Sequence, residues 1–146
     1  MSEEFYLKVK KLRPEGKISA PVKFGDAGFD VYAMENYALW PRRLYKMPLG
    51  IAIEFPLDYV CQVNQKSGLA SETGIDTIGN IIDAGYRGEI HAIIVNMSDL
   101  KVDIKQGQKI AQLLFLRCGI TKNIEYVDIL SDSKRGNTGF GSTGKF

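Results

Sequence analysis

The chain of 146 residues is long enough for one domain with a hydrophobic core and leaves little room for a second. Its formal net charge of +2 is too small to indicate nucleic acid or a membrane surface as a partner. No apolar run approaches the length of a membrane-spanning helix, and the charged opening MSEEFYLKVK does not resemble a signal peptide. We therefore expect a soluble intracellular protein, cytoplasmic or nuclear, that binds neither nucleic acid nor a membrane.

Short strands are expected along the first part of the chain. Apolar and polar residues alternate over residues 5–12, which predicts an opening strand. The segment FGDAGFDVYA predicts a glycine turn that enters a second strand, with Asp30 near the start of that strand. Three more strands, over residues 44–47, 51–55 and 59–63, are separated by prolines, which argue against helices and for sheet edges and turns.

Residues 65–74, QKSGLASETG, are the only passage with a helical pattern. Ser67 is predicted as its N-cap, with the N–H groups of the first turn facing outward. A β-hairpin is predicted next, with residues 81–82 and 90–95 as its arms and a glycine-bent tip between them. A polar connection is predicted over residues 97–103. A strand over residues 109–116 and a short strand over residues 124–129 follow it.

The many short strands with closely spaced turn signals predict an all-β fold, a jelly roll or distorted barrel. After residue 130 the composition changes to SDSKRGNTGFGSTGKF, which is rich in glycine and poor in apolar side chains. We therefore expect a β domain over residues 1–130 and a flexible glycine-rich arm over residues 131–146.

The two cysteines, Cys61 and Cys118, lie far apart in apolar, strand-like segments. This pattern favours buried free thiols, and a disulfide stays open as the alternative. Neither the cysteines nor the single histidine, His91, has the spacing of a metal-ligand cluster.

The tip of the predicted hairpin carries Asp83 and Tyr86. A hairpin tip needs neither a carboxylate nor an aromatic ring in order to fold, so both side chains are candidates for a functional site. The alternative stays open at this point, because aspartate is a common turn residue that binds its own backbone.

The arm holds a second set of candidates. Arg135 precedes the glycine-rich run that contains Phe140, so the arm offers a guanidinium, hydroxyls, backbone N–H groups and a ring. These groups suit phosphate oxygens and a planar base, and a disordered terminus is the alternative. Lys66, Ser67 and Gly68 form a second candidate phosphate site. Together the two sites favour a nucleoside triphosphate, and neither the P-loop nor the Rossmann pattern is present.

The chain resembles the trimeric deoxyuridine triphosphatase (dUTPase, dUTP diphosphatase) family over nearly its whole length. Five motifs carry the resemblance in the family's order: AGFD (27–30), KSGLA (66–70), IIDAGYRGE (81–89), GQKIAQL (107–113) and RGNTGFGSTG (135–144). The resemblance implies a β jelly-roll homotrimer with sites at subunit junctions. It also implies Mg²⁺-assisted hydrolysis of dUTP to dUMP and pyrophosphate, which limits uracil incorporation into DNA and supplies dUMP.

The resemblance implies a role for each candidate residue. Asp83 would be the base that activates the water attacking the α-phosphorus, and Tyr86 would pack under the deoxyribose and exclude a 2′-hydroxyl. Phosphates and water would hold the Mg²⁺, and Asp30, an anchor for charged groups of the site, would lie near it. The other substrate-binding residues would be Lys66, Ser67 and Gly68 on the phosphates, Asn80, Ile81, Ile82 and His91 at the uracil edge, Gln112 in the water and phosphate network near the metal, and Arg135, Phe140, Gly141 and Ser142 in the closing arm.

Four positions depart from the family pattern: Lys66 replaces an arginine, Asn80 a glycine, Gly85 an acid and Thr138 a glycine. At residue 66 an ammonium is a point charge, where a guanidinium would bind phosphate with two N–H groups. We expect the four departures to affect substrate contacts and not the reaction class.

Two other functions compete with this interpretation. A deoxycytidine triphosphate deaminase, or a bifunctional relative of it, would not need the glycine-rich arm. A non-catalytic nucleotide-binding regulator on the same scaffold would lack Asp83 or the arm, and both are present.

Overall fold

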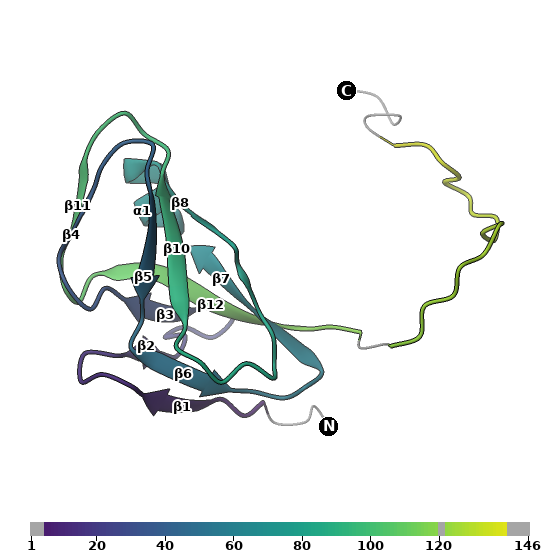
Figure 1. The fold of residues 1–146 in the computed structure, drawn as a ribbon, viewed down its shortest axis with the longest axis horizontal. Helices are drawn as coiled ribbons and strands as arrows, with labels where there is room; N and C mark the ends of the chain where they lie inside the picture. Colours follow the sequence, from purple (N-terminus) through teal and green to yellow (C-terminus); the bar gives the residue numbers. More distant parts are fainter. Residues whose placement is uncertain (1–4, 120–121, 140–146) are drawn as a thin grey trace.

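The computed structural model describes residues 5–119 and 122–139. Within these residues the chain forms short strands and one short helix, as Figure 1 shows. The helix is α1 (Ser67–Thr73), and the strands are β1 (Lys8–Lys11), β2 (Ile18–Ser19), β3 (Phe29–Tyr32), β4 (Tyr37–Leu39), β5 (Leu44–Pro48), β6 (Ile51–Glu54), β7 (Tyr59–Gln65), β8 (Ile75–Ile78), β9 (Ile81–Ile82), β10 (His91–Asn96), β11 (Val102–Ile104) and β12 (Lys109–Arg117).

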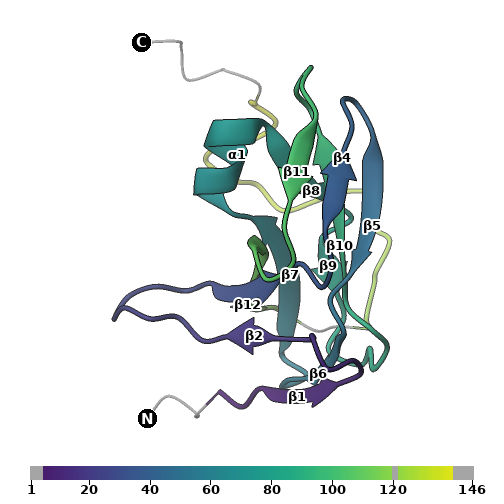
Figure 2. The ribbon, with the colours of Figure 1, turned by 90° about the vertical axis from the view of Figure 1, so that its left-hand side faces the viewer.

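The described strands form four antiparallel sheets. The largest sheet has the order β2-β3-β12-β7-β9, and a second has the order β5-β10-β8. Two smaller sheets pair β1 with β6 and β11 with β4. In Figure 1, β12 and β7 run steeply across β5 and β10, and Figure 2 shows β1 and β6 together at one end of the molecule.

The hydrophobic core lies between the sheets, and several strands turn every second side chain toward it. β10 alternates along its whole length and buries Ala92, Ile94 and Asn96. The amide of Asn96 is satisfied, since its Nδ2 donates to the carbonyls of Leu39 and Leu100 at 2.8 Å each. Close packing of this kind fixes the strands that carry the candidate site.

The prediction of an all-β fold of the jelly-roll type is confirmed. The strands expected over residues 44–47, 51–55, 59–63 and 109–116 correspond to β5, β6, β7 and β12. The opening strand is shorter than expected, and the helix lies inside the predicted passage. Alternating polarity was therefore a sound guide wherever one face of a strand is buried.

The predicted pairing of the two hairpin arms is wrong. β9 pairs with β7, so that Ile82 faces Cys61, whereas β10 pairs with β5 and β8. Gly79, between β8 and β9, has a φ of 63°, a left-handed conformation that glycine adopts without steric cost. The chain passes there from one sheet to the other, and the tip that follows is wider than that of a tight hairpin.

Three smaller predictions are also wrong. Helix α1 begins at Ser67, and its N-cap is Lys66, which is extended and makes no capping hydrogen bond with its side chain. The expected connection over residues 97–103 includes the start of β11. No strand forms over residues 124–129 of the described chain, where Ile124 and Ile129 are largely exposed, because these residues find no partner strand within one copy.

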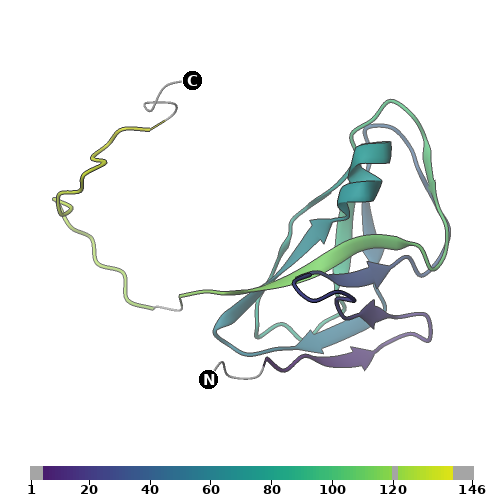
Figure 3. The ribbon, with the colours of Figure 1, turned by 180° about the vertical axis from the view of Figure 1, so that it is seen from behind.

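Residues 122–139 extend away from the body of the molecule (Figures 1 and 3). The hydrogen bonds around Arg135 are local, since Thr138 and Gly136 bond to Arg135 and Ser133. The predicted division of the chain at residue 130 stays a prediction.

Both cysteines are free, so they do not form a disulfide. Burial raises the pKa of the Cys61 thiol to about 12, which keeps the thiol protonated and unreactive. Cys118 is only partly buried, so the expectation of a buried thiol holds for Cys61 alone. No helix in the described part of the chain is long and apolar enough to cross a membrane.

Candidate active site

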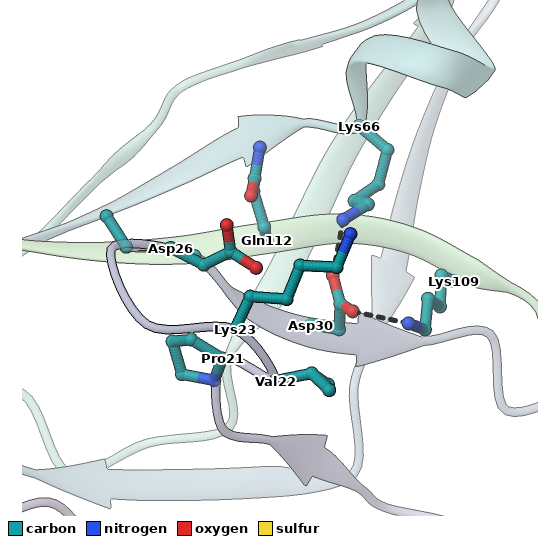
Figure 4. A pocket seen from close by; sticks show the side chains of 10 residues that line it. Pro21, Val22, Lys23, Asp26, Asp30, Lys66, Lys109 and Gln112 are labelled. Atoms are coloured by element: carbon teal, nitrogen blue, oxygen red, sulfur yellow. Dashed lines mark hydrogen bonds and ion pairs between the residues drawn. The ribbon is translucent and has the colours of Figure 1, made fainter.

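A pocket of about 370 Å³ lies beside β3, where the loop before β3 approaches the end of β7 and the strand β12 (Figure 4). It brings together the first, second and fourth sequence motifs, which are far apart along the chain. Its walls are formed by Pro21, Val22, Lys23, Asp26, Ala27, Gly28, Asp30, Lys66, Lys109 and Gln112. Three lysines face two carboxylates in this set, so the pocket has an excess of positive charge that suits phosphate groups.

Asp30 links two of these lysines. Its Oδ1 accepts a hydrogen bond from Lys66 Nζ at 2.6 Å, and its Oδ2 lies 2.7 Å from Lys109 Nζ, as the dashed lines of Figure 4 show. The Asp30 side chain is only 13% exposed. One carboxylate therefore holds two ammonium groups in the wall of the pocket and offsets their mutual repulsion.

The pKa of Asp30 reflects this position. Burial of the carboxyl would raise its pKa, but the hydrogen bonds and charges of Lys109 and Lys66 outweigh burial, and the pKa lies below its ordinary value. The same contact raises the pKa of Lys109. Asp30 and Lys109 are therefore both charged at neutral pH.

Gln112 enters the pocket from β12 and lies against Gly28. Its Nε2 donates to the carbonyl of Gln65 at 3.0 Å. A methyl group at residue 28 would overlap the Gln112 Oε1, so the absence of a side chain at Gly28 allows the amide to take this place.

Ser67 and Gly68 follow Lys66 at the start of α1, and both are exposed. The first N–H groups of a helix have no acceptor within the helix. Apart from Gly68, its two neighbours and the backbone of its own helix, no atom of the described residues lies within 4 Å of the point that a Cβ at Gly68 would occupy. The backbone here is open to a ligand.

Asp83 lies at the start of the turn that follows β9. The N–H of Tyr86 donates to the Asp83 carbonyl at 3.0 Å, and Nη1 of Arg87 donates to the Ala84 carbonyl at 2.6 Å. The Asp83 side chain is exposed, and it has no hydrogen bond or ion pair within the described chain. The turn is therefore closed without the Asp83 carboxylate.

Tyr86 has a fixed place on the same turn. Its hydroxyl donates to the Glu89 carbonyl at 3.1 Å, and the ring lies so close to Gly88 that a methyl group there would overlap it. The ring is nevertheless 46% exposed, which leaves it available to pack against a ligand.

Asn80, Ile81 and Ile82 present an open backbone edge. β9 is the last strand of its sheet in the described chain, so only its β7 side is paired. Across the tip, β10 pairs with β8 only from Ile93 onward, and Nδ1 of His91 lies 3.0 Å from a backbone carbonyl oxygen. Both sides of the wide tip therefore offer backbone donors and acceptors.

The pocket and the turn do not meet within one chain. Ile82 faces Cys61, so Asp83 lies level with the start of β7, whereas Lys66 follows the end of that strand. At about 3.3 Å per residue, the stretch of extended chain between these two levels spans about 20 Å. The Lys66 pocket and the Asp83 turn are thus at opposite ends of β7.

The remaining candidates belong to the arm. Nε of Arg135 donates to the Thr138 carbonyl at 3.0 Å, and the segment that carries both residues extends away from the body (Figure 1). Phe140, Gly141 and Ser142 lie outside the described residues.

Sequence reasoning missed three residues that shape the site: Lys109, Gly28 and Arg87. Each lies inside a motif, so the motif itself was the available signal. Their contacts join residues distant in sequence or depend on the path of a turn, which alternation of polar and apolar residues does not predict.

Within residues 5–119 and 122–139, no group of three or more His, Cys, Asp or Glu side chains could hold a metal ion. Asp30 is not a free ligand either, because both of its oxygens contact lysines. The expected Mg²⁺ ion, held mainly by the phosphates of a ligand, stays a prediction.

Comparisons with known proteins identify the family of the chain. The family model described as dUTPase matches residues 15–144. The deoxyuridine 5'-triphosphate nucleotidohydrolase of Clostridium tetani is 38% identical over 144 residues, covering 97% of this chain and 99% of that protein. The protein of the same name from Clostridioides difficile is 41% identical over 143 residues, covering 96% and 99%.

A solved structure is also similar over nearly the whole chain. It is a mutant of the Staphylococcus bacteriophage 80alpha dUTPase with dUpNHpp, with a TM-score of 0.86 and 25% identity over 95% of this chain and 98% of that one. The chain belongs to the dUTPase family.

The Asp30 contacts predict a pH-dependent contribution to stability. Because the folded-state pKa of Asp30 is lowered, its contribution is fully present above about pH 5 and is lost as the pH falls through the folded-state pKa. In urea unfolding at pH 7, Asp30→Asn should therefore have a lower free energy of unfolding than the unmodified chain. This difference between the two free energies should become smaller below about pH 4.

The matched control is Asp99→Asn, which removes a carboxylate from an exposed pair with Arg42 and should change stability little at either pH. A gap for Asp30→Asn that stays constant or widens toward low pH would contradict this assignment.

Proposed function

We propose that the chain hydrolyses dUTP to dUMP and pyrophosphate at a site made from the Lys66 pocket and the Asp83 turn. Membership of the dUTPase family supports this activity. The observation that carries the proposal is that the two surfaces differ in chemistry. The pocket is cationic, and the turn offers a carboxylate, an aromatic ring and open backbone groups. The first suits a triphosphate, and the second suits a nucleoside and a water molecule.

The pocket binds the phosphates in this proposal. Lys66 supplies charge, while Ser67 and Gly68 donate from their exposed backbone and hydroxyl groups at the start of α1. Gln112 holds the water and phosphate network through an amide whose other end is bound to Gln65. Asp30 positions Lys66 and Lys109 and does not contact the phosphates itself.

The wide tip reads the base. Uracil is distinguished from cytosine by the pattern of donors and acceptors on one ring edge, and a buried mispaired group penalises the wrong base. The open edge of Asn80, Ile81 and Ile82, with the backbone near His91, provides such directed groups. The Tyr86 ring packs under the sugar and leaves no space for a 2′-hydroxyl.

Asp83 is the catalytic base of the reaction. Its exposed carboxylate accepts a proton from the attacking water, whose oxygen forms a bond to the α-phosphorus while pyrophosphate leaves. Phosphoryl transfer to water depends on positioning the reacting groups and on neutralising charge more than on a strong nucleophile. A Mg²⁺ ion bound through the phosphates would supply charge neutralisation, and Gln112 would contact its water.

The site is completed by an assembly of copies, for which we propose a homotrimer. Within one copy, Lys66 and Asp83 lie about 20 Å apart, as the rise per residue along β7 implies. A water molecule beside phosphates that are bound at Lys66 would therefore lie too far from Asp83 of the same copy. Packing the Lys66 pocket of one copy against the Asp83 turn of another removes this separation.

The charge pattern of the segment that leads into the arm supports such an assembly. β1 is an exposed edge strand with the sequence KVKK, and it is basic. Residues 122–132, KNIEYVDILSD, carry three acids among exposed apolar side chains. An acidic extended segment fits a basic open strand edge of a second copy, and this would direct Arg135, Phe140, Gly141 and Ser142 toward a site of the assembly.

The function is tested by pyrophosphate release from dUTP, UTP, dCTP and dTTP, each with and without Mg²⁺. We expect release from dUTP with Mg²⁺ and little from the others. Loss of the cytosine absorbance with dCTP would instead indicate a deaminase, and binding of dUTP without release would indicate a non-catalytic regulator.

Asp83→Asn should retain nucleotide binding and lower kcat by about 10²- to 10⁴-fold, the usual span for a positioned base. Steady-state kinetics and calorimetric binding of dUpNHpp measure the two effects. Turnover close to that of the unmodified chain would remove Asp83 from this role.

Gly88→Ala should move the Tyr86 ring and lower the preference for dUTP over UTP by about tenfold. Gly119→Ala, outside the candidate site, is the matched control, because a methyl group there meets no atom within 4 Å apart from its own residue and its chain neighbours. The role of Gly88 is refuted by equal preferences in both variants.

Deletion of residues 131–146 should leave the fold intact, because the hydrogen bonds around Arg135 in the described chain are local. Activity should fall by at least about 10²-fold if the arm excludes water from the site. Circular dichroism and pyrophosphate release measure the two properties, and a truncated chain that is folded and fully active would contradict the role of the arm.

A further inference from the structure

The loop between β2 and β3 forms the wall of the pocket opposite Lys66. It carries Lys23 next to Pro21 and Val22. The loop turns back at this point, since the N–H of Asp26 donates to the Lys23 carbonyl at 3.1 Å. Gly25, inside the turn, has a φ of 93°, which a side chain would disfavour. The local backbone thus directs Lys23 into the pocket lining.

The three lysines of the pocket are not equivalent. The ammonium groups of Lys66 and Lys109 are held by the two oxygens of Asp30, at 2.6 and 2.7 Å. Within the described chain, Lys23 has neither an ion pair nor a hydrogen bond from its ammonium group. In Figure 4 its side chain extends from the loop toward the end of the pocket where Asp30 lies.

The charge of the pocket depends on Lys23. Without it, the lining would hold Lys66 and Lys109 against Asp26 and Asp30, and would be formally neutral. With it, the pocket has one positive charge in excess. The N–H donors of an unpaired ammonium can all turn toward an anion, whereas those of Lys66 are shared with a carboxylate.

We propose that Lys23 is a further phosphate-binding residue, which contacts the triphosphate across the pocket from Lys66. The assignment rests on the proposed function for the identity of the nucleotide. Lys23 supplies the charge-assisted contact that the Lys66 ammonium, held by Asp30, gives only in part. The loop that carries it is exposed at Val22 and Phe24, so it can adjust as the phosphates enter.

The test compares Lys23→Gln with Lys105→Gln. Lys105 is an exposed lysine outside the pocket, so both variants lose the same charge. For dUTP hydrolysis, Lys23→Gln should raise KM by about tenfold, the scale of one lost hydrogen bond to a charged group, with kcat changed by less than about twofold. Lys23→Arg should have a KM close to that of the unmodified chain, and Lys105→Gln should leave KM unchanged.

Calorimetric binding of inorganic tripolyphosphate separates this proposal from the proposed function, because the probe has no base or sugar. Weaker binding by Lys23→Gln alone supports the Lys23 site, even if the unmodified chain failed to hydrolyse dUTP. Hydrolysis of dUTP by the unmodified chain, with the same KM and tripolyphosphate affinity in Lys23→Gln, would overturn the Lys23 site and leave the function standing. Equal changes in the two glutamine variants would also overturn it, since they would report only the overall charge.

Discussion

The pairing of β9 with β7 is the constraint on which the candidate site depends. By placing Ile82 opposite Cys61, it carries the Asp83 turn to one end of β7, while Lys66 emerges at the other end. Among the residues that the structure describes, it also leaves the outer edge of β9 unpaired and the tip before β10 wide. The same register therefore creates the backbone edge that suits a base and separates it from the pocket that suits phosphates.

The charged groups of the pocket are of two kinds: those that pair with one another and those that are free to bind a ligand. Asp30 has both oxygens bound to lysines, and its lowered pKa means that this arrangement persists at neutral pH. Lys66 reaches Asp30 through a single ammonium group, so its charge is shared between that carboxylate and any bound phosphate. Lys23, on the loop before β3, is the lysine of the pocket lining that Asp30 does not hold.

Local patterns in the sequence were sufficient to predict most strands, because alternation reports a half-buried strand directly. They could not predict the partner of β9, since register between strands depends on the whole core and on the turn at Gly79. The apolar residues around Ile124 misled for a related reason: their pattern is that of a strand, yet the described chain offers them no partner. Motif resemblance indicated the pocket residues, whereas Lys109 and Gly28 became evident only through contacts with Asp30 and Gln112.

Complementation between two inactive variants tests most directly whether the site is shared between copies. One variant carries Asp83→Asn, and the other carries Lys66→Met with Gln112→Ala; each is prepared alone, and the two are then unfolded and refolded together in equal amounts. If Asp83 and Lys66 of one site come from different copies, random assembly should restore about a quarter of the wild-type activity. Activity of the mixture that stays at the level of the separate variants, with mixed assemblies verified by differential tagging, would show that each copy builds its own site and would contradict the account.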